Sequence, residues 1–159
     1  MARGRYRYLV LVVLAVVLAT VFYPSETKRI KKVLKAIRES VLQEDIGQVM
    51  EYISYNYHDE YGGSYLVLKK RAEMIFHRFN DFEITADIMN ITVDGEQAEA
   101  DLKVNIIATE DGRRGYVIGD AERAGDIRVF LEKSPFKWKV INIDHAVDAD
   151  IPHGSKNVN

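Results

Sequence analysis

The amino-acid sequence predicts an α+β protein: an N-terminal membrane segment, then three helices packed on a curved antiparallel sheet of about four strands. Three observations carry this prediction. Residues 9–22 form an apolar run interrupted only by Thr20. Apolar residues then recur at the three- and four-residue spacing of amphipathic helices as far as residue 79. From residue 82 the apolar period changes to two, which is typical of strands covered on one face, and helices beside such strands make an α+β architecture.

The composition is that of a globular chain and excludes several kinds of chemistry. Of the 159 residues, 47% are hydrophobic and 29% charged, which suits one domain with its own core. The absence of cysteine excludes disulfides, thiolate catalysis and cysteine-bound metals. The formal net charge of -2 gives no general attraction to nucleic acid. We expect no nucleic-acid partner, no metal ion and no cofactor.

The first 23 residues have two interpretations. Arg3, Arg5 and Arg7 precede the apolar run, as in a secretory signal peptide, and Val17-Leu18-Ala19 is an acceptable cleavage site. The interpretation that we favour is an uncleaved anchor, although a helix over residues 8–23 spans about 24 Å and the hydrocarbon core is about 30 Å thick. The residues expected to face lipid are Leu9, Val12, Leu14, Val17, Leu18 and Phe22.

The side of the membrane is argued from the charges around the run. Residues 28–38 are more basic than the N-terminal flank, which would keep the domain in the cytoplasm. However, the run begins almost at residue 1, like an export signal, and the later charges belong to an amphipathic helix. We therefore expect a single-pass, membrane-anchored protein with an extracytoplasmic domain, or a secreted one if the leader is cleaved. The basic face of residues 28–38 fits anionic lipid and a solvated helix surface equally well.

Each helix has a start signal and an apolar face. Ser25 is the expected N-cap of the first helix, Asp45 of the second and Ser64 of the third. The apolar faces comprise Ile30, Val33, Leu34, Ile37 and Val41 in the first helix; Ile46, Val49, Met50 and Ile53 in the second; and Leu68, Ala72, Ile75 and Phe79 in the third.

The strands follow as a meander. Asp94-Gly95 and Asp111-Gly112 are turn signals, and Ser134-Pro135 turns the chain before the last strand. The alternating segments are residues 82–88, 98–108, 127–131 and 136–145, with a short strand fragment at 116–118. The domain therefore covers residues 24–147, and the polar residues 148–159 are predicted to be a disordered tail.

The last strand and the element order together resemble a known superfamily. The closing segment Phe136-Lys-Trp138-Lys-Val140-Ile-Asn-Ile143 places a tryptophan ahead of alternating aliphatic residues, after a Glu-Lys-Ser-Pro turn. With a long first helix before a short second one, residues 25–146 resemble the nuclear transport factor 2-like superfamily, also called the SnoaL-like or cystatin-like cone fold. The resemblance implies a cone-shaped sheet.

What the resemblance implies about activity is broad. The superfamily includes isomerases, dehydratases, binding pockets and assembly domains, and its enzymes carry a Tyr/Asp or His/Asp pair inside the cone. No residue of this chain is assigned to such a pair by the resemblance. A short anchor followed by one such domain resembles assembly proteins of bacterial envelopes, including the inner-membrane component of type IV secretion systems.

The candidate catalytic residues come from two places. Tyr57 and His58 lie in a dense polar cluster between the second and third helices. There His58 could act with Asp59 or Glu60 as an acid/base pair or bind a metal, although no metal-ligand spacing is present. His77 and Asp81 flank the end of the third helix and could lie at a pocket mouth. A polar loop accounts better for the first pair, and a histidine favoured by the helix C-terminus accounts better for the second. The sequence therefore favours no catalytic set.

Four aromatic residues are candidates to line a ligand pocket, and they are Tyr65, Tyr116, Phe136 and Trp138. Aromatic residues at alternating strand positions are more often part of the core. The leading hypothesis is thus a membrane-tethered, non-catalytic binding or assembly domain. It would contact lipid through its N-terminal segment, and a protein partner or a second copy through the exposed sheet face. The alternative is a small-molecule-binding pocket protein, or a lyase or isomerase, of the same fold.

Overall fold

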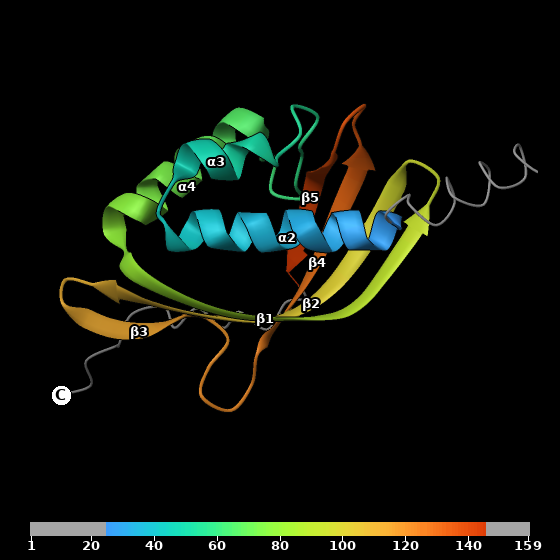
Figure 1. Cartoon of the computed structure of the whole chain (residues 1–159). Helices are drawn as coiled ribbons and strands as arrows, with labels where there is room; N and C mark the ends of the chain where they lie inside the picture. The colour runs from blue at the N-terminus through green and yellow to red at the C-terminus, as the bar shows by residue number, and fades with distance from the viewer. Residues whose placement is uncertain (1–24, 146–159) are drawn as a thin grey trace, which may run out of the picture.

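The computed structural model describes residues 25–145, which form three helices followed by a five-stranded antiparallel sheet (Figure 1). The predicted membrane segment and tail lie outside the described residues. The helices are α2 (Glu26–Leu42), α3 (Ile46–Glu51) and α4 (Tyr65–Arg78), and the strands are β1 (Asn80–Asp94), β2 (Gln97–Glu110), β3 (Arg113–Ile118), β4 (Gly125–Lys133) and β5 (Trp138–His145). The predicted α+β class is confirmed. Between residues 25 and 145, no helix has the length and apolar character needed to cross a bilayer.

Two of the three predicted helix caps are confirmed by their hydrogen bonds. The Ser25 side chain accepts from the backbone N–H of Lys28 at 3.4 Å, and Asp45 accepts from the N–H of Gln48 at 3.0 Å. Ser64 occupies the N-cap position of α4 but makes no side-chain cap bond. A side-chain cap stabilises a helix by about 1 kcal/mol, so the first turns of α2 and α3 have a stabilising hydrogen bond that the first turn of α4 lacks.

The sheet curves because β2 has different neighbours along its two halves. Residues 97–104 of β2 pair with β4, whereas residues 106–110 pair with β3. Both neighbours use the same edge of β2, since its other edge pairs with β1 throughout. The fragment predicted at 116–118 is thus a full fifth strand, β3, which extends the β1–β2 ribbon beyond the rest of the sheet (Figure 1).

Cross-strand pairing sorts the side chains onto two faces of the sheet. Residues opposite one another in a ladder point to the same side, and successive residues alternate. The face that packs against the helices has the rows Ile91–Ala100–Val129–Ile143 and Val93–Ala98–Leu131–Val140. The other side, which we call the outer face, has the rows Asp87–Lys103–Asp126 and Asp101–Arg128–Asp144, with Glu99 beside them.

The space between the sheet and the helices is filled by one hydrophobic core. Ile30 and Val33 of α2 and Met50 of α3 pack with the inner rows of the sheet. Trp138, at the start of β5, is 1% exposed and is the largest fully buried side chain among the described residues. Its indole Nε1 donates to Glu26 Oε2 at 2.7 Å, so the buried N–H is satisfied at the start of α2.

Most strand boundaries differ from the prediction by a few residues, and two of the differences have a local cause. β1 continues to Asp94, well past residue 88. A register shift between Ile88 and Asn90 inserts one extra residue into β1 and reverses the alternation of apolar residues, so the period-two pattern breaks there although the strand goes on. β5 begins at Trp138 and not at Phe136, because the backbone N–H of Ser134 bonds to the carbonyl of Lys137 and closes a turn there. Phe136 lies in that turn and is 96% exposed.

Candidate functional site

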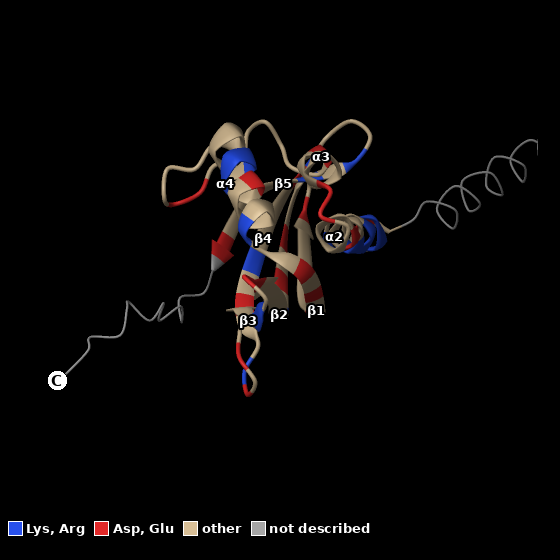
Figure 2. Ribbon diagram, turned by 90° about the vertical axis from the view of Figure 1, so that its left-hand side faces the viewer, with Lys and Arg blue, Asp and Glu red and all other residues tan. Residues whose placement is uncertain are grey.

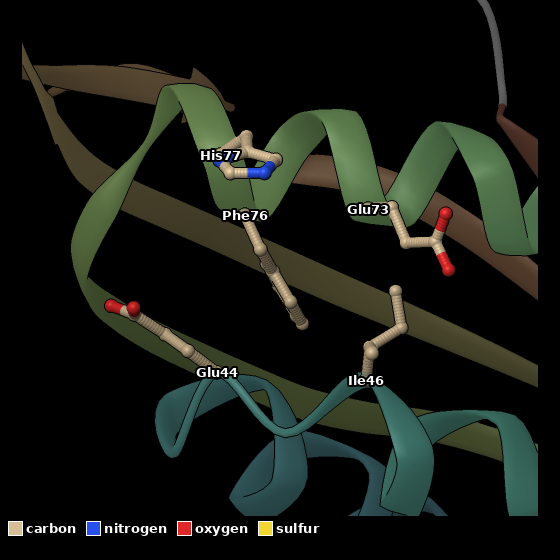
Figure 3. A pocket seen from close by; sticks show the side chains of 5 residues that line it. All are labelled: Glu44, Ile46, Glu73, Phe76 and His77. Atoms are coloured by element: carbon tan, nitrogen blue, oxygen red, sulfur yellow. The ribbon is translucent and has the colours of Figure 1, made fainter.

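A pocket of about 310 Å3 lies between α4 and the connection from α2 to α3. Glu73, Phe76 and His77 reach it from α4, where spacings of three and four residues place side chains on one side of a helix. Glu44 and Ile46 line it from the opposite side (Figure 3). Phe76 and Ile46 make its apolar part, and two carboxylates and one imidazole make its polar part.

Two residues with unusual backbone conformations, joined by a hydrogen bond, lie at the mouth of this pocket. Glu44 and Asp81 both have left-handed backbones, with φ of 55° and 52°. The backbone N–H of Asp81 donates to Glu44 Oε1 at 3.1 Å, which ties the α2–α3 connection to the start of β1. One carboxylate oxygen of the pocket is therefore already engaged by the fold.

The polar groups of the pocket do not form an acid/base pair. Glu73 and His77 lie one helical turn apart on α4, but Figure 3 shows the Glu73 carboxylate and the His77 ring pointing in different directions. Between residues 25 and 145 the structure has no ion pair between His77 and a carboxylate. The arrangement can receive a small ligand with an apolar part and a positive charge, and it offers no proton relay.

The predicted cluster around His58 is a folded loop along the edge of the sheet. The backbone of Ser54 donates to the carbonyl of Val140 at 2.8 Å and that of His58 donates to the carbonyl of Ile141 at 3.0 Å, so the loop covers the edge strand β5. His58 is exposed, and its Nδ1 lies 3.1 Å from the carbonyl oxygen of Asn56. Tyr57 is 4% exposed, and burial, followed by the charge of Asp59, raises its pKa.

Asp59 stabilises this loop and is not paired with His58. Its carboxylate accepts from the backbone N–H groups of Gly63 at 2.6 Å and Tyr61 at 3.0 Å, and from Arg71 of α4 at 3.0 Å. Gly63 packs so closely that a Cβ there would lie 2.2 Å from Asp59 Oδ2. The carboxylate is thus saturated with donors, and the loop residues do not converge on a reacting point.

The structure brings His77 to the pocket but not the side chain of Asp81. Asp81 contributes its backbone, whose N–H donates to Glu44 and whose carbonyl accepts from Arg114 at 3.5 Å. No hydrogen bond between the His77 and Asp81 side chains occurs in residues 25–145. Sequence reasoning missed Glu44 and Glu73. Glu73 stands four residues before His77 on one helix, and this spacing was the available signal.

The four aromatic candidates lie in four different environments. The Tyr65 ring packs at a tilt against that of Tyr55 with centroids 4.6 Å apart, and burial raises the pKa of Tyr65. Tyr116 is on β3 and 47% exposed, Phe136 is in solvent, and Trp138 is in the core. None of the four lines the pocket between α4 and the α2–α3 connection.

The titratable groups also form no metal site in the part described. Within residues 25–144, no three His, Asp or Glu side chains are grouped so that they could hold a metal ion.

Comparisons with known proteins place the chain by its fold. No protein-family model matches the sequence, and no curated protein matches it. Among solved structures, a scytalone dehydratase-like protein from Novosphingobium aromaticivorans is similar with a TM-score of 0.63 and 15% identity, over 76% of this chain and 82% of that one. A ketosteroid isomerase-like protein from Erwinia carotovora atroseptica gives 0.62 and 14%, over 76% and 95%.

A third similar structure is a protein of unknown function with a cystatin-like fold from Nostoc punctiforme. It has a TM-score of 0.61 and 15% identity, over 79% of this chain and 93% of that one. Identities this low show the fold alone. The chain therefore shares the cone-shaped fold of these structures, as the resemblance to the nuclear transport factor 2-like superfamily implied.

Proposed function

We propose that this chain is a non-catalytic binding domain with the cone fold, tethered to a membrane by its first 23 residues. A protein partner binds it on the outer face of the sheet. The observation that carries the proposal is the packed core: Trp138, Leu131 and Val140 are almost fully buried, so the part of the interior that they occupy has no room for a ligand. The candidate reactive groups support it, because Asp59 already accepts hydrogen bonds from Gly63 of the loop and Arg71 of α4, and His58 and His77 are exposed.

The charge of the outer face indicates the kind of partner. The two rows named above and Glu99 hold five carboxylates against two cations, Lys103 and Arg128. Arg128 bonds to Asp101 at 2.9 Å and Glu99 at 2.8 Å, and Lys103 bonds to Asp126 at 2.7 Å. The excess of negative charge favours a partner with a basic surface, while a second copy docked face to face would place like charges together.

The test is partner recovery from membranes that contain the full chain, with a sheet-face variant beside it. Asp101→Asn with Asp144→Asn removes two carboxylates of one row without changing their size, and Glu73→Gln on α4 is the matched control. The proposal expects a stable partner with wild type and Glu73→Gln, and a strongly reduced yield with the double variant. A domain that stays monomeric and recovers no partner contradicts it, and a homodimer assigns the face to a second copy.

The pocket at Glu44, Glu73 and His77 favours a second candidate function, which is the binding of a small organic cation. Phe76 and Ile46 would cover its apolar part and the carboxylates its charge. The probe is phenethylamine. A rise in Tm of the full chain that Glu73→Gln abolishes supports this function, and equal melting with and without the amine excludes it for this ligand class.

A further inference from the structure

Four lysines form a stripe along the outward side of α2. Lys28, Lys31, Lys32 and Lys35 are all exposed, and their spacing of three, four and seven residues places them on one helical face. The opposite side of α2 buries Ile30 and Val33 against the sheet. In Figure 2 the blue of the basic residues runs along the side of α2 that faces away from the strands. We call these four residues the lysine stripe.

The lysine stripe has little charge compensation from the described residues. Lys35 makes a surface ion pair with Glu39 at 3.6 Å, and no carboxylate between residues 25 and 145 lies within ion-pair distance of the other three lysines. The remaining basic residues of α2 are used by the domain. Arg29 pairs with Glu26 at 3.7 Å, and Arg38 Nε donates to the carbonyl of Ile84 at 3.0 Å. The stripe therefore concentrates like charge on the outward face, which a solvated helix ordinarily breaks with acidic residues.

The position of the stripe in the chain brings it close to the proposed bilayer. The apolar run ends at Phe22 and α2 begins at Glu26. Three intervening residues reach at most about 11 Å when fully extended. Electrostatic attraction to an anionic surface extends over a Debye length of about 8 Å at physiological salt. If the run lies in a membrane, the first lysines stand at the head groups before any docking occurs.

The charge of the whole domain favours one orientation at such a surface. The lysine stripe is on the helix side of the molecule, and the carboxylates of Asp87, Asp101 and Asp144 are on the outer face of the sheet. Figure 2 shows red acidic residues along the strands and blue residues on the side of α2 that faces away from them, with further blue residues on α4 and on some strands. An anionic bilayer attracts the lysine stripe and repels the acidic outer face. Both forces turn the domain the same way, with α2 towards the bilayer and the outer face away from it.

We propose that the lysine stripe of α2 lies against anionic phospholipid head groups and so fixes the orientation of the domain, with its outer sheet face turned away from the bilayer. The inference rests on the proposed tethering. Lipid is the favoured ligand because the apolar run would keep the bilayer next to the start of α2, which gives the head groups a high effective concentration there. An acidic protein would have to be recruited from solution.

The experiment measures lysine acetylation by mass spectrometry on the full chain reconstituted in vesicles. One set of vesicles is phosphatidylcholine alone, and the other also contains phosphatidylglycerol. Lys69 and Lys70, which are exposed on α4, serve as internal controls for vesicle sidedness. In anionic vesicles we expect acetylation of Lys28, Lys31 and Lys32 to slow several-fold relative to these controls, and high salt to remove the difference.

A pair of variants tests whether the lysines act together. Lys28→Gln with Lys31→Gln keeps Lys32 and Lys35 as reporters, and its protection of Lys32 in anionic vesicles should fall towards the value in phosphatidylcholine. Lys69→Gln with Lys70→Gln on α4 is the matched control, with Lys32 protected as in wild type. All four side chains are exposed, so neither variant removes packing, and circular dichroism melts verify that both fold.

The outcomes separate this inference from the function on which it rests. Equal acetylation in both vesicle types, with a chain that floats with both, overturns the lysine stripe as a lipid site and leaves the tethering in place. A chain that floats with neither type overturns both. Protection by a soluble polyglutamate peptide on phosphatidylcholine vesicles, without protection by phosphatidylglycerol, assigns the stripe to an acidic protein and also overturns the inference.

Discussion

At the scale of single residues, the contact between Glu26 and Trp138 joins the start of α2 to the last strand. Glu26 accepts from the Trp138 indole and from Lys133 Nζ, at 2.7 and 2.9 Å. The contact joins two segments that are 112 residues apart in the sequence, one near each end of the described chain. A buried aromatic ring whose only polar atom is satisfied can close the core without a desolvation penalty.

Replacement of Trp138 tests this contact. Trp138→Phe loses the indole donor and part of the ring, and we expect it to lower the free energy of unfolding by about 1–2 kcal/mol. Trp138→Ala should lower it by about 3–5 kcal/mol because it leaves a cavity. Urea denaturation of the full chain in detergent, followed by circular dichroism, measures both. Phe136→Ala is the control two residues away, and a change there beyond about 0.5 kcal/mol would contradict the exposed position of that ring.

The pH dependence of stability gives a second prediction at this scale. Hydrogen bonds from Lys133 and then Trp138 lower the pKa of Glu26 from its ordinary value of 4.5. Ionised Glu26 therefore contributes stability that is fully present above about pH 4.5 and is lost as the pH falls through the lower, folded-state pKa. We expect Glu26→Gln to flatten this part of the Tm against pH curve. Glu39→Gln, on the outward side of the same helix, should leave the curve as in wild type, and equal flattening by both variants would refute the assignment.

Asp59 gives the third prediction. If its role is structural, its replacement should lower the stability of the fold, whereas a purely catalytic residue could be replaced without loss of stability. Its side chain is 7% exposed and accepts two backbone N–H bonds as well as Arg71. Asp59→Ala should lower the free energy of unfolding by about 2–3 kcal/mol, since it leaves these donors without an acceptor. Glu60→Ala, its exposed neighbour, should change it by less than about 0.5 kcal/mol. Unchanged stability in Asp59→Ala would show that the carboxylate does not stabilise the loop.

At the scale of elements, the three helices are attached to the sheet to different degrees. α2 buries Ile30 and Val33 in the core, and α3 buries Met50. α4 has no fully buried residue. Tyr65 and Leu68 pack against the edge of the core while staying partly exposed, and the ion pairs of Arg71 with Asp59 and of Arg78 with Glu110 add to this contact. Surface ion pairs contribute at most about 1 kcal/mol each, so α4 is the helix that packs least strongly against the rest of the domain.

This difference predicts the order of amide exchange. Backbone amides of α4 should exchange faster than those of α2 and the centre of β2, because local opening of α4 exposes little apolar surface. Hydrogen exchange read by mass spectrometry on the full chain in detergent checks this. Protection of α4 equal to that of α2 would mean that α4 is held by contacts stronger than those described.

The sequence predicted the elements whose signals are local and missed those that depend on distant partners. Ser25 and Asp45 were identifiable as caps because the groups they bond lie three residues away. The second half of β1 was missed because the bulge between Ile88 and Asn90 breaks the period that identifies a strand. The pocket was only half predicted, since Glu44 and His77 come from separate elements and meet through tertiary packing alone.

At the scale of the whole molecule, the fold separates charge between its two sides. The helices cover the apolar rows of the sheet and present the lysine stripe, while the outer face keeps an excess of carboxylates. A net charge of -2 conceals this separation, because the opposing faces nearly cancel in the sum. A molecule of this kind is oriented by a charged surface although it has almost no net attraction to one.

The most direct test of the central claim is a high-resolution crystal structure of the full chain that shows the water inside the cone. We expect Trp138, Tyr57 and the inner rows of the sheet to touch one another, with no solvent-filled cavity between them. A hydrated cavity in which an imidazole and a carboxylate lie within hydrogen-bond distance would contradict it.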